Sequence, residues 1–203
     1  MNYIASIITI IVIVAIFVGS VALGKAINNQ RIKSVGKRGE KAAIKYLQKV
    51  LQEDDLLFSN VKISFNGKET ELDDVIVNKY GVFIFEVKTF VGELSGTEND
   101  KEWTKVHTTP AGNTYIKTVR NPIRQVKRQI YILASYFKEN KIYVFVNGYA
   151  IFAKGNCPLN IKEHVLRNSR DIDKTIHSTS HKQLNQETIT KIQKLLDGAV
   201  ALE

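Results

Sequence analysis

The chain has 203 residues, of which 44% are hydrophobic, and carries a formal charge of +9 at pH 7. This length and hydrophobic content predict one ordinary domain with a buried core. The single cysteine, Cys157, excludes an internal disulfide framework and is typical of a reducing compartment. The positive charge favours an anionic partner, either a nucleic acid or an acidic membrane surface, and does not by itself decide between them.

The first long feature of the chain is an apolar segment over residues 4–23, which contains no charged side chain. A helix of this length would be about 30 Å long, which matches the hydrocarbon core of a bilayer. A cleavable signal peptide would begin with basic residues and have a shorter apolar centre. We therefore expect an uncleaved transmembrane anchor over residues 1–24, with residues 4–23 in contact with the lipid bilayer.

A basic linker over residues 25–35 follows the predicted anchor. Positive residues crowd this flank and the start of the next segment: Lys25, Arg31, Lys33, Lys37 and Arg38. The positive-inside rule then places the amino terminus outside the cell membrane and the rest of this single-pass chain in the cytoplasm. The same charges would lie against anionic headgroups, so part of the net charge serves the membrane.

Residues 36–52, "GKRGEKAAIKYLQKVLQ", predict a helix, because apolar side chains recur at helical spacing with lysines on the other side. Glu40 precedes Ala43 and Ile44 by three and four residues, so it shares their inward face. Two explanations stay open for this carboxylate. One is a first-turn glutamate favoured by the helix dipole. The other is a functional group.

Three strands and two turns are expected next. The strands are "LLFSNVKISF" (56–65), "TELDDVIVN" (70–78) and "VFIFEVKTF" (82–90), and the turns are "NGK" and "KYG". Short connections of this kind predict an antiparallel meander. Residues 92–113 are expected to form an irregular excursion around Trp103.

Helical and strand patterns alternate in the rest of the chain. Residues 121–140 predict a helix with Asn121 as its cap and Pro122 at its first position. Residues 141–152 predict a strand, or a strand pair broken near Asn147–Gly148, and residues 184–198 predict a closing helix. The expected fold is α/β or α+β, with a central mixed sheet flanked by helices in layers.

Charged residues in the expected meander gather at one place. Side chains alternate along a strand, so Glu86 and Lys88 share a face, and antiparallel pairing brings Asp73 towards them. Asp74 should point the opposite way. Two carboxylates 4 Å apart repel by about 4 kcal/mol at an effective dielectric near 20. Lys88 offsets one charge, whereas a divalent cation offsets both, and oxygen ligands suit Mg²⁺.

Two interpretations of this cluster stay open. A salt bridge from Lys88 to Glu86 or Asp73 on a solvated strand end needs no metal. A metal site would instead suit hydrolysis of a phosphodiester, since a bound cation polarises a phosphoryl oxygen and activates water. Lys88 would then orient that water or stabilise charge developing on the phosphate.

Several ordered blocks of the chain resemble one family. They are "RGEKAAIKYL", "TELDDVIVNKYGVFIFEVKTFVGELSG", Trp103, "NPIRQVKRQIYIL" and "IYVFVNGYAIF". Together they resemble the nuclease-related domain (NERD) family, which is grouped with the PD-(D/E)xK nucleases. The resemblance covers roughly residues 36–152. It implies a restriction-endonuclease-like core and a metal-dependent nuclease activity.

The resemblance also implies roles for particular residues. Asp73 matches the first metal-binding aspartate, and Glu86 and Lys88 match the acidic residue and the lysine of the family signature. The carbonyl of Val87 is implied as a further metal ligand, and Glu40 matches a helical glutamate beside the active site. The implied cofactor is Mg²⁺, for which Mn²⁺ would substitute. Gln125 matches a recurring family position of unassigned role, and Asp74 stands where the family often has histidine or another polar residue.

A basic surface is expected around the start of the helix over residues 121–140. Its members are Lys117, Arg120, Arg124, Lys127 and Arg128. Such side chains neutralise phosphates without choosing a sequence. The alternative is an ordinary solvated basic face. Trp103 is expected to pack in the core rather than to stack on bases. A zinc site at His177 and His181 lacks a third ligand and is not favoured.

The sequence thus predicts a membrane-anchored nuclease with its domain over residues 36–155 and an extension over 156–203. DNA is the expected partner, and the oligomeric state is not predicted. One alternative is a catalytically inactive module that binds nucleic acid or a protein at the membrane. Another is an envelope protein that uses the fold as a scaffold.

Overall fold

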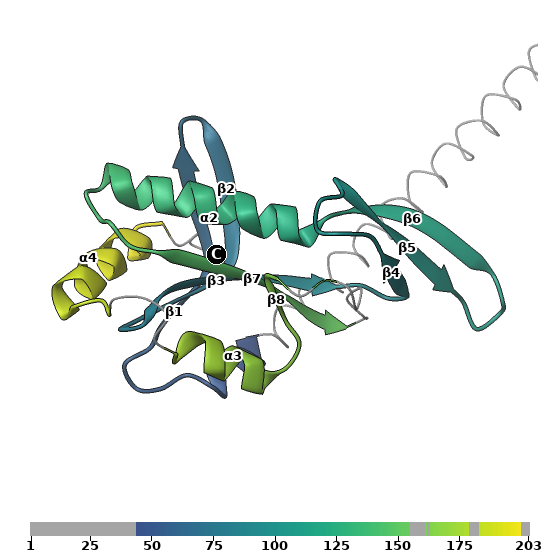
Figure 1. The fold of residues 1–203 in the computed structure, drawn as a ribbon, viewed down its shortest axis with the longest axis horizontal. Coiled ribbons are helices and arrows are strands. Elements are labelled where there is room, and N and C mark those ends of the chain that lie inside the picture. The colour runs from purple at the N-terminus through teal and green to yellow at the C-terminus, as the bar shows by residue number, and fades with distance from the viewer. Residues whose placement is uncertain (1–43, 155–160, 162, 179–182, 200–203) are drawn as a thin grey trace, which may run out of the picture. The chain divides into compact units, whose positions relative to one another are not determined.

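The computed structural model describes residues 44–154, 161, 163–178 and 183–199. These residues form a mixed α+β fold in which helices cover a central sheet of five strands (Figure 1). The strand order is β1-β2-β3-β7-β8, and a separate sheet of three strands has the order β4-β5-β6. The expected mixed sheet flanked by helices is confirmed.

The first three strands form the predicted antiparallel meander: β1 (Leu56–Phe65), β2 (Lys68–Asn78) and β3 (Gly81–Thr89). Asn66 and Gly67 connect β1 to β2 and both have positive φ, at 49° and 70°. Left-handed residues at both turn positions match the twist of the flanking strands. The turns therefore determine the register of the meander, which places the end of β3 opposite the middle of β2.

Two parallel strands complete the central sheet. β7 (Val146–Lys154) pairs with β3, and the short β8 (Val165–Leu166) pairs with β7. Of the two alternatives for this segment, the single strand is confirmed and the broken pair is wrong, because β7 is continuous through Asn147 and Gly148. A Cβ on Gly148 would approach a Val126 side-chain carbon to 2.8 Å. Glycine is used here for close packing against a helix rather than for a turn.

Helices cover both faces of the central sheet. α2 (Pro122–Glu139) and α4 (Gln186–Asp197) pack on one face, together with Val75, Val77, Val82 and Ile84. α3 (Ser169–Ile176) and Leu47, from a helical turn over residues 44–48, pack on the other face with Phe83 and Phe85. The predicted caps of α2 are observed, with Asn121 accepting from the Ile123 N–H at 2.9 Å and proline at the first position.

The expectation of an irregular excursion over residues 92–113 was wrong. β4 (Glu93–Ser95), β5 (Glu102–Thr108) and β6 (Thr114–Arg120) form an antiparallel sheet. β4 has only three residues, and β6, which follows the expected excursion, is exposed along nearly all of its length, so neither gives the hydrophobic alternation of a half-buried strand. Trp103 is fully buried at the base of this sheet, as expected for core packing.

Among the described residues, no helix is long and apolar enough to cross a membrane. The predicted anchor over residues 1–24, the linker over 25–35, and Glu40 lie outside the described residues.

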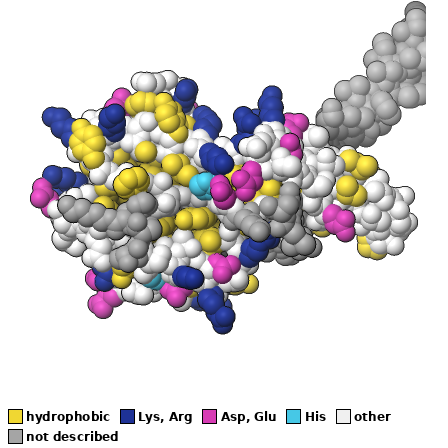
Figure 2. Space-filling model, in the orientation of Figure 1, with side chains coloured by type: hydrophobic (Ala, Val, Ile, Leu, Met, Phe, Trp, Pro, Cys, Tyr) yellow, Lys and Arg dark blue, Asp and Glu magenta, His cyan; other side chains and the backbone are white. Residues whose placement is uncertain are grey.

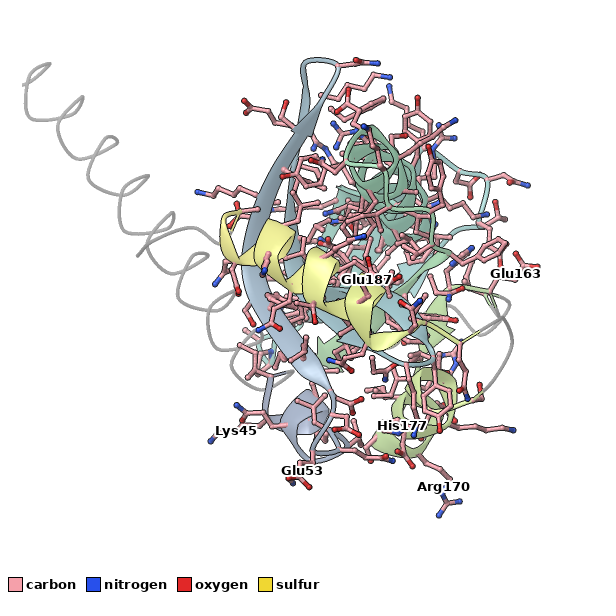
Figure 3. The ribbon with its side chains drawn as sticks, turned by 90° about the vertical axis from the view of Figure 1, so that its left-hand side faces the viewer. Lys45, Glu53, Glu163, Arg170, His177 and Glu187 are labelled. Atoms are coloured by element: carbon pink, nitrogen blue, oxygen red, sulfur yellow. The ribbon has the colours of Figure 1, made fainter. Side chains whose placement is uncertain are left out.

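His177, at the C-terminal end of α3, joins that helix to the start of the meander (Figure 3). Its Nδ1 lies 2.7 Å from Asp173 Oδ1, and its Nε2 lies 2.9 Å from Asp55 Oδ2. Burial alone would lower the pKa of His177, but the two carboxylates outweigh burial and raise the pKa above its usual value. Both ring nitrogens of His177 thus form a structural link between α3 and Asp55, rather than binding zinc. His181, the other residue of the zinc site that the sequence did not favour, lies outside the described residues.

The link predicts a pH-dependent contribution to stability. Only the protonated ring donates to both carboxylates, since neutral imidazole has one donor. Because the pKa of His177 is higher in the folded protein than in the unfolded chain, the link contributes fully to stability below about pH 6.5. This contribution is lost as the pH rises through the pKa of His177 in the folded protein. We expect His177→Gln to cost about 1–3 kcal/mol at acid pH and less at alkaline pH, as measured by urea unfolding. Arg170→Gln, on the exposed side of α3, is the control, and an equal cost of His177→Gln at both pH values would contradict the link.

Candidate functional site

The candidate site lies where β2 and β3 separate. Asp74 pairs with Phe85 at the end of their ladder, so Asp73 is the residue that would next face Glu86. At this point a side chain of β2, rather than its backbone, bonds to β3: Asp73 Oδ2 accepts a 2.8 Å hydrogen bond from the Val87 N–H. The structure therefore brings Asp73 to the same end of β3 as Glu86 and Lys88.

The neighbouring strand bends at the same place. Asn60 of β1 has a φ of 57° and, among the described strands, forms no ladder pair with Asp73. Beyond this point Leu72 packs in the same core as Val75, although strict alternation predicts the opposite face. Asp74 is buried, and its Oδ1 accepts a 2.5 Å hydrogen bond from Ser59 Oγ.

Glu86 is buried, with 2% of its surface exposed, and a donor lies at each of its oxygens. Lys88 Nζ forms an ion pair with Oε1. Gln129 of α2 donates from Nε2 to Glu86 Oε2 at 2.5 Å and to the Glu71 carbonyl at 3.2 Å. The expected ion pair of Lys88 is thus present, and the carboxylate is held in place from two sides.

Gln129 is a site residue that the sequence reasoning missed. It is fully buried, and its Oε1 has no hydrogen-bond partner among the described residues. Gln125, which was singled out instead, is half-buried one turn earlier on α2. Gln129 lies three residues after Val126 and four before Leu133, within the apolar stripe of the helix. A polar residue in such a stripe needs a buried partner, and this pattern would have pointed to it.

The electrostatics of the site favour a proton or a cation at Asp73. Burial, followed by the nearby charge of Glu86, raises the pKa of Asp73 to about 7, and the Val87 N–H and Lys88 oppose this rise. An ordinary exposed aspartate has a pKa near 3.9. The negative charge of Asp73 is therefore destabilised in the fold, because burial and the charge of Glu86 outweigh the Val87 N–H and Lys88.

The residues present fit a divalent cation. Each Glu86 oxygen accepts one donor and retains a further lone pair, so the carboxylate can still ligate. A cation between Glu86 and Asp73 would also remove the charge penalty that raises the Asp73 pKa. Among the described residues no three His, Cys, Asp or Glu side chains cluster as a metal site. Carbonyl oxygens, such as that of Val87, and water would complete the coordination that Mg²⁺ prefers.

The expected basic surface is only partly free for a ligand. Arg124 Nη1 donates to the Asn99 carbonyl at 3.2 Å, and Arg128 Nη2 donates to the Glu69 carbonyl at 3.0 Å. These two side chains tie α2 to the β4–β5 loop and to β2, while Lys127 is exposed beside them. Figure 2 shows that Lys and Arg side chains are spread over the outside of this face rather than gathered in one patch.

Comparisons with known proteins identify the family of the chain. The nuclease-related domain family matches residues 35–153, which include Asp73, Glu86, Lys88 and Gln129. An uncharacterized protein of Bacillus anthracis is 28% identical over 86 residues, and the match covers 42% of this chain and 41% of that protein. The chain thus spans less than half the length of that relative. No solved structure matches the chain. Because the family match covers more than half of the chain, the protein belongs to the nuclease-related domain (NERD) family, whose general kind is the PD-(D/E)xK superfamily.

Proposed function

We propose that the protein is a membrane-anchored, metal-dependent nuclease that hydrolyses phosphodiester bonds, with DNA as its substrate. The observation that carries the proposal is the buried Glu86, held between Lys88 and Gln129 beside a destabilised Asp73. A restriction-endonuclease-like core is part of the proposal. The five-stranded mixed sheet with helices on both faces supports it.

Each side chain of the site has a distinct role in this proposal. Asp73, Glu86 and the Val87 carbonyl would hold Mg²⁺, or Mn²⁺ in its place, and Glu40 would stand beside them. When bound, the cation supplies Lewis-acid stabilisation of a phosphoryl oxygen and activation of water. Lys88 places a positive charge beside Glu86 and stabilises charge developing on the phosphate. Gln129 holds Glu86 in one orientation by donating to Oε2.

The place of action follows from the sequence expectations. The apolar segment over residues 4–23 would hold the domain at the cytoplasmic face of the cell membrane. The exposed cations Lys117, Arg120 and Lys127 would contact phosphates. Arg124 and Arg128 would add positive charge to this surface while their side chains stay bonded to backbone carbonyls.

A cleavage assay tests the proposed activity. The full-length chain in neutral detergent is expected to cut duplex DNA with Mg²⁺ and to stop when EDTA is added. Lys88→Ala is expected to lower the cleavage rate by about 10²–10³-fold, because it removes a charge that stabilises the developing phosphate charge. Asp73→Ala should also fail to cut. Metal-independent cutting, or cutting by both variants at the wild-type rate, would refute the nuclease proposal.

The alternative of a catalytically inactive binding module has one supporting observation. Lys88 is already paired with Glu86, which is what a structural salt bridge requires. Such a module would bind DNA in a salt-sensitive way, would show no turnover with Mg²⁺, and would retain its affinity when Lys88 is replaced.

A further inference from the structure

The β5–β6 ribbon, formed by Glu102–Thr108 and Thr114–Arg120, carries side chains besides Lys117 and Arg120 to which the proposed function gives no role. Its strands extend away from the central sheet, at the end where β3 leads into β4 (Figure 1). Six of the seven residues of β6 are exposed. Side chains of β6 therefore add little to the core, and their chemistry requires another explanation.

The strand register assigns the side chains of the ribbon to two faces. Residues directly opposite each other share a face, and the face changes with each step along the strand. One face holds three opposed pairs: Trp103 with Val119, Lys105 with Lys117, and His107 with Tyr115. We call it the lysine face. The other face holds Glu102 with Arg120 and Val106 with Ile116.

Two like charges lie directly opposite each other on the lysine face. Such a cross-strand pair destabilises a sheet, and natural strands usually place opposite charges there. Neither Lys105 nor Lys117 forms an ion pair among the described residues. Both acidic residues of the three-stranded sheet, Glu93 and Glu102, lie on the other face. An external anion would remove the repulsion that the chain leaves in place.

The lysine face begins beside the proposed active site. Trp103 at its base stacks on Phe152, with ring centroids 6.4 Å apart and planes 13° apart. Phe152 lies opposite Lys88 in the β3–β7 pairing. Lys105 and His107 follow Trp103 by two and four residues, or about 7 and 13 Å along the strand. A nucleic acid whose scissile phosphate reached Lys88 would therefore have flanking phosphates near these side chains.

We propose that the lysine face of the β5–β6 ribbon binds the phosphate backbone of duplex nucleic acid beside the scissile phosphate, with Lys105 and Lys117 as its main contacts. The proposal rests on the proposed function and adds the element that holds the substrate. His107 and Tyr115 have polar groups suited to further backbone contacts. A two-stranded ribbon also has the dimensions of the major groove of a duplex.

An acidic membrane surface fits the ribbon less well. Membrane-binding surfaces place lysines beside apolar side chains that enter the lipid. Here Ile116 is 70% exposed, but it lies with Val106 on the face opposite the two lysines. The ribbon therefore separates its lysines from its most exposed aliphatic side chain, and Tyr115, the exposed aromatic residue on the lysine face, carries a polar hydroxyl.

Binding measured without cleavage tests the proposal. The full-length chain in neutral detergent is titrated with a duplex in EDTA over a range of salt concentrations. The double change Lys105→Gln and Lys117→Gln is expected to weaken binding and to lower the slope of log K against log salt by about 1.8, or 0.9 for each lost phosphate contact. The matched control, Lys138→Gln with Lys194→Gln, removes the same charge at the C-terminal ends of α2 and α4 and should keep the wild-type slope.

Thermal unfolding and lysine labelling complete the test. The melting temperature of the ribbon variant should not fall, because the change relieves a like-charge pair. Duplex should slow amine-reactive labelling of both ribbon lysines in wild type. An unchanged salt slope would overturn the proposal, even if the enzyme cleaves DNA. Labelling slowed by phosphatidylserine nanodiscs and not by duplex would assign the face to the membrane and overturn it too. Lack of cleavage alone would refute the nuclease activity and leave the ribbon proposal standing.

Discussion

Asp73→Asn is expected to stabilise the metal-free protein while abolishing its cleavage of DNA. The folded pKa of Asp73, about 7, is raised above the value near 3.9 expected in the unfolded chain. Stability is therefore lost as pH rises through about 7, where the folded protein must accept a destabilised charge. Asparagine carries no charge and keeps an oxygen that can accept from the Val87 N–H.

The size of this effect follows from the pKa difference. A difference of about 3 pKa units corresponds to about 4 kcal/mol, and solvent screening of the half-buried side chain reduces this to about 2 kcal/mol. For a chain of this length, the melting temperature of Asp73→Asn should rise by roughly 4–8 °C near pH 8 in EDTA. Little difference from wild type should remain below about pH 4.

Two controls separate charge relief from other effects. Adding Mg²⁺ should stabilise wild type and not the variant, since only the native carboxylate pair holds the cation. Asp74→Asn changes the adjacent buried carboxylate, which accepts from Ser59, and is expected to lower the melting temperature instead. A lower melting temperature for Asp73→Asn near pH 8 in EDTA would contradict the electrostatic account of the site.

Gln129→Leu is expected to weaken Mg²⁺ activation of cleavage by about 10–100-fold, the usual effect of removing a group that orients a metal ligand. Leucine has a similar size but leaves Glu86 Oε2 without its buried donor. The same loss should lower the free energy of unfolding by about 1–3 kcal/mol. Titrating Mg²⁺ at saturating DNA measures the shift in activation separately from the loss of stability.

Gln125→Leu is the matched control for this change. Gln125 lies one turn earlier on α2 and is half-buried, and the same replacement there should leave the Mg²⁺ titration close to wild type. If Gln125→Leu shifted the titration and Gln129→Leu did not, the role given to Gln129 would be wrong.

The meeting of Asp73 with Glu86 and Lys88 could be predicted because it depends on local features. A short turn before Gly81 determines the register of β2 and β3, and alternation along β3 places Glu86 and Lys88 on one face. Both rules act over a few residues that are adjacent in the chain. The same rules failed at Leu72, which packs in the same core as Val75 next to the point where the left-handed Asn60 lies in β1.

Tertiary contacts decided the rest of the site. Nothing local to Gln129 says that α2 will cross β3 at the depth of Glu86, because that meeting joins residues 43 positions apart. The parallel pairing of β3 with β7 and the separate β4–β6 sheet likewise depend on which surfaces remain to be covered.

The sequence by itself determined the elements with strong hydrophobic periodicity and their caps. It also determined that Asp73, Glu86 and Lys88 of the β2–β3 hairpin lie near one another. It did not reveal the β5–β6 ribbon, because β6 is exposed along nearly all of its length and has no buried face to set a period. Only the folded structure showed that two lysines 12 positions apart lie opposite each other beside Trp103. Hydrophobic periodicity in the sequence indicates which side chains are buried. Which side chains then contact one another depends on packing between segments that are distant in the sequence.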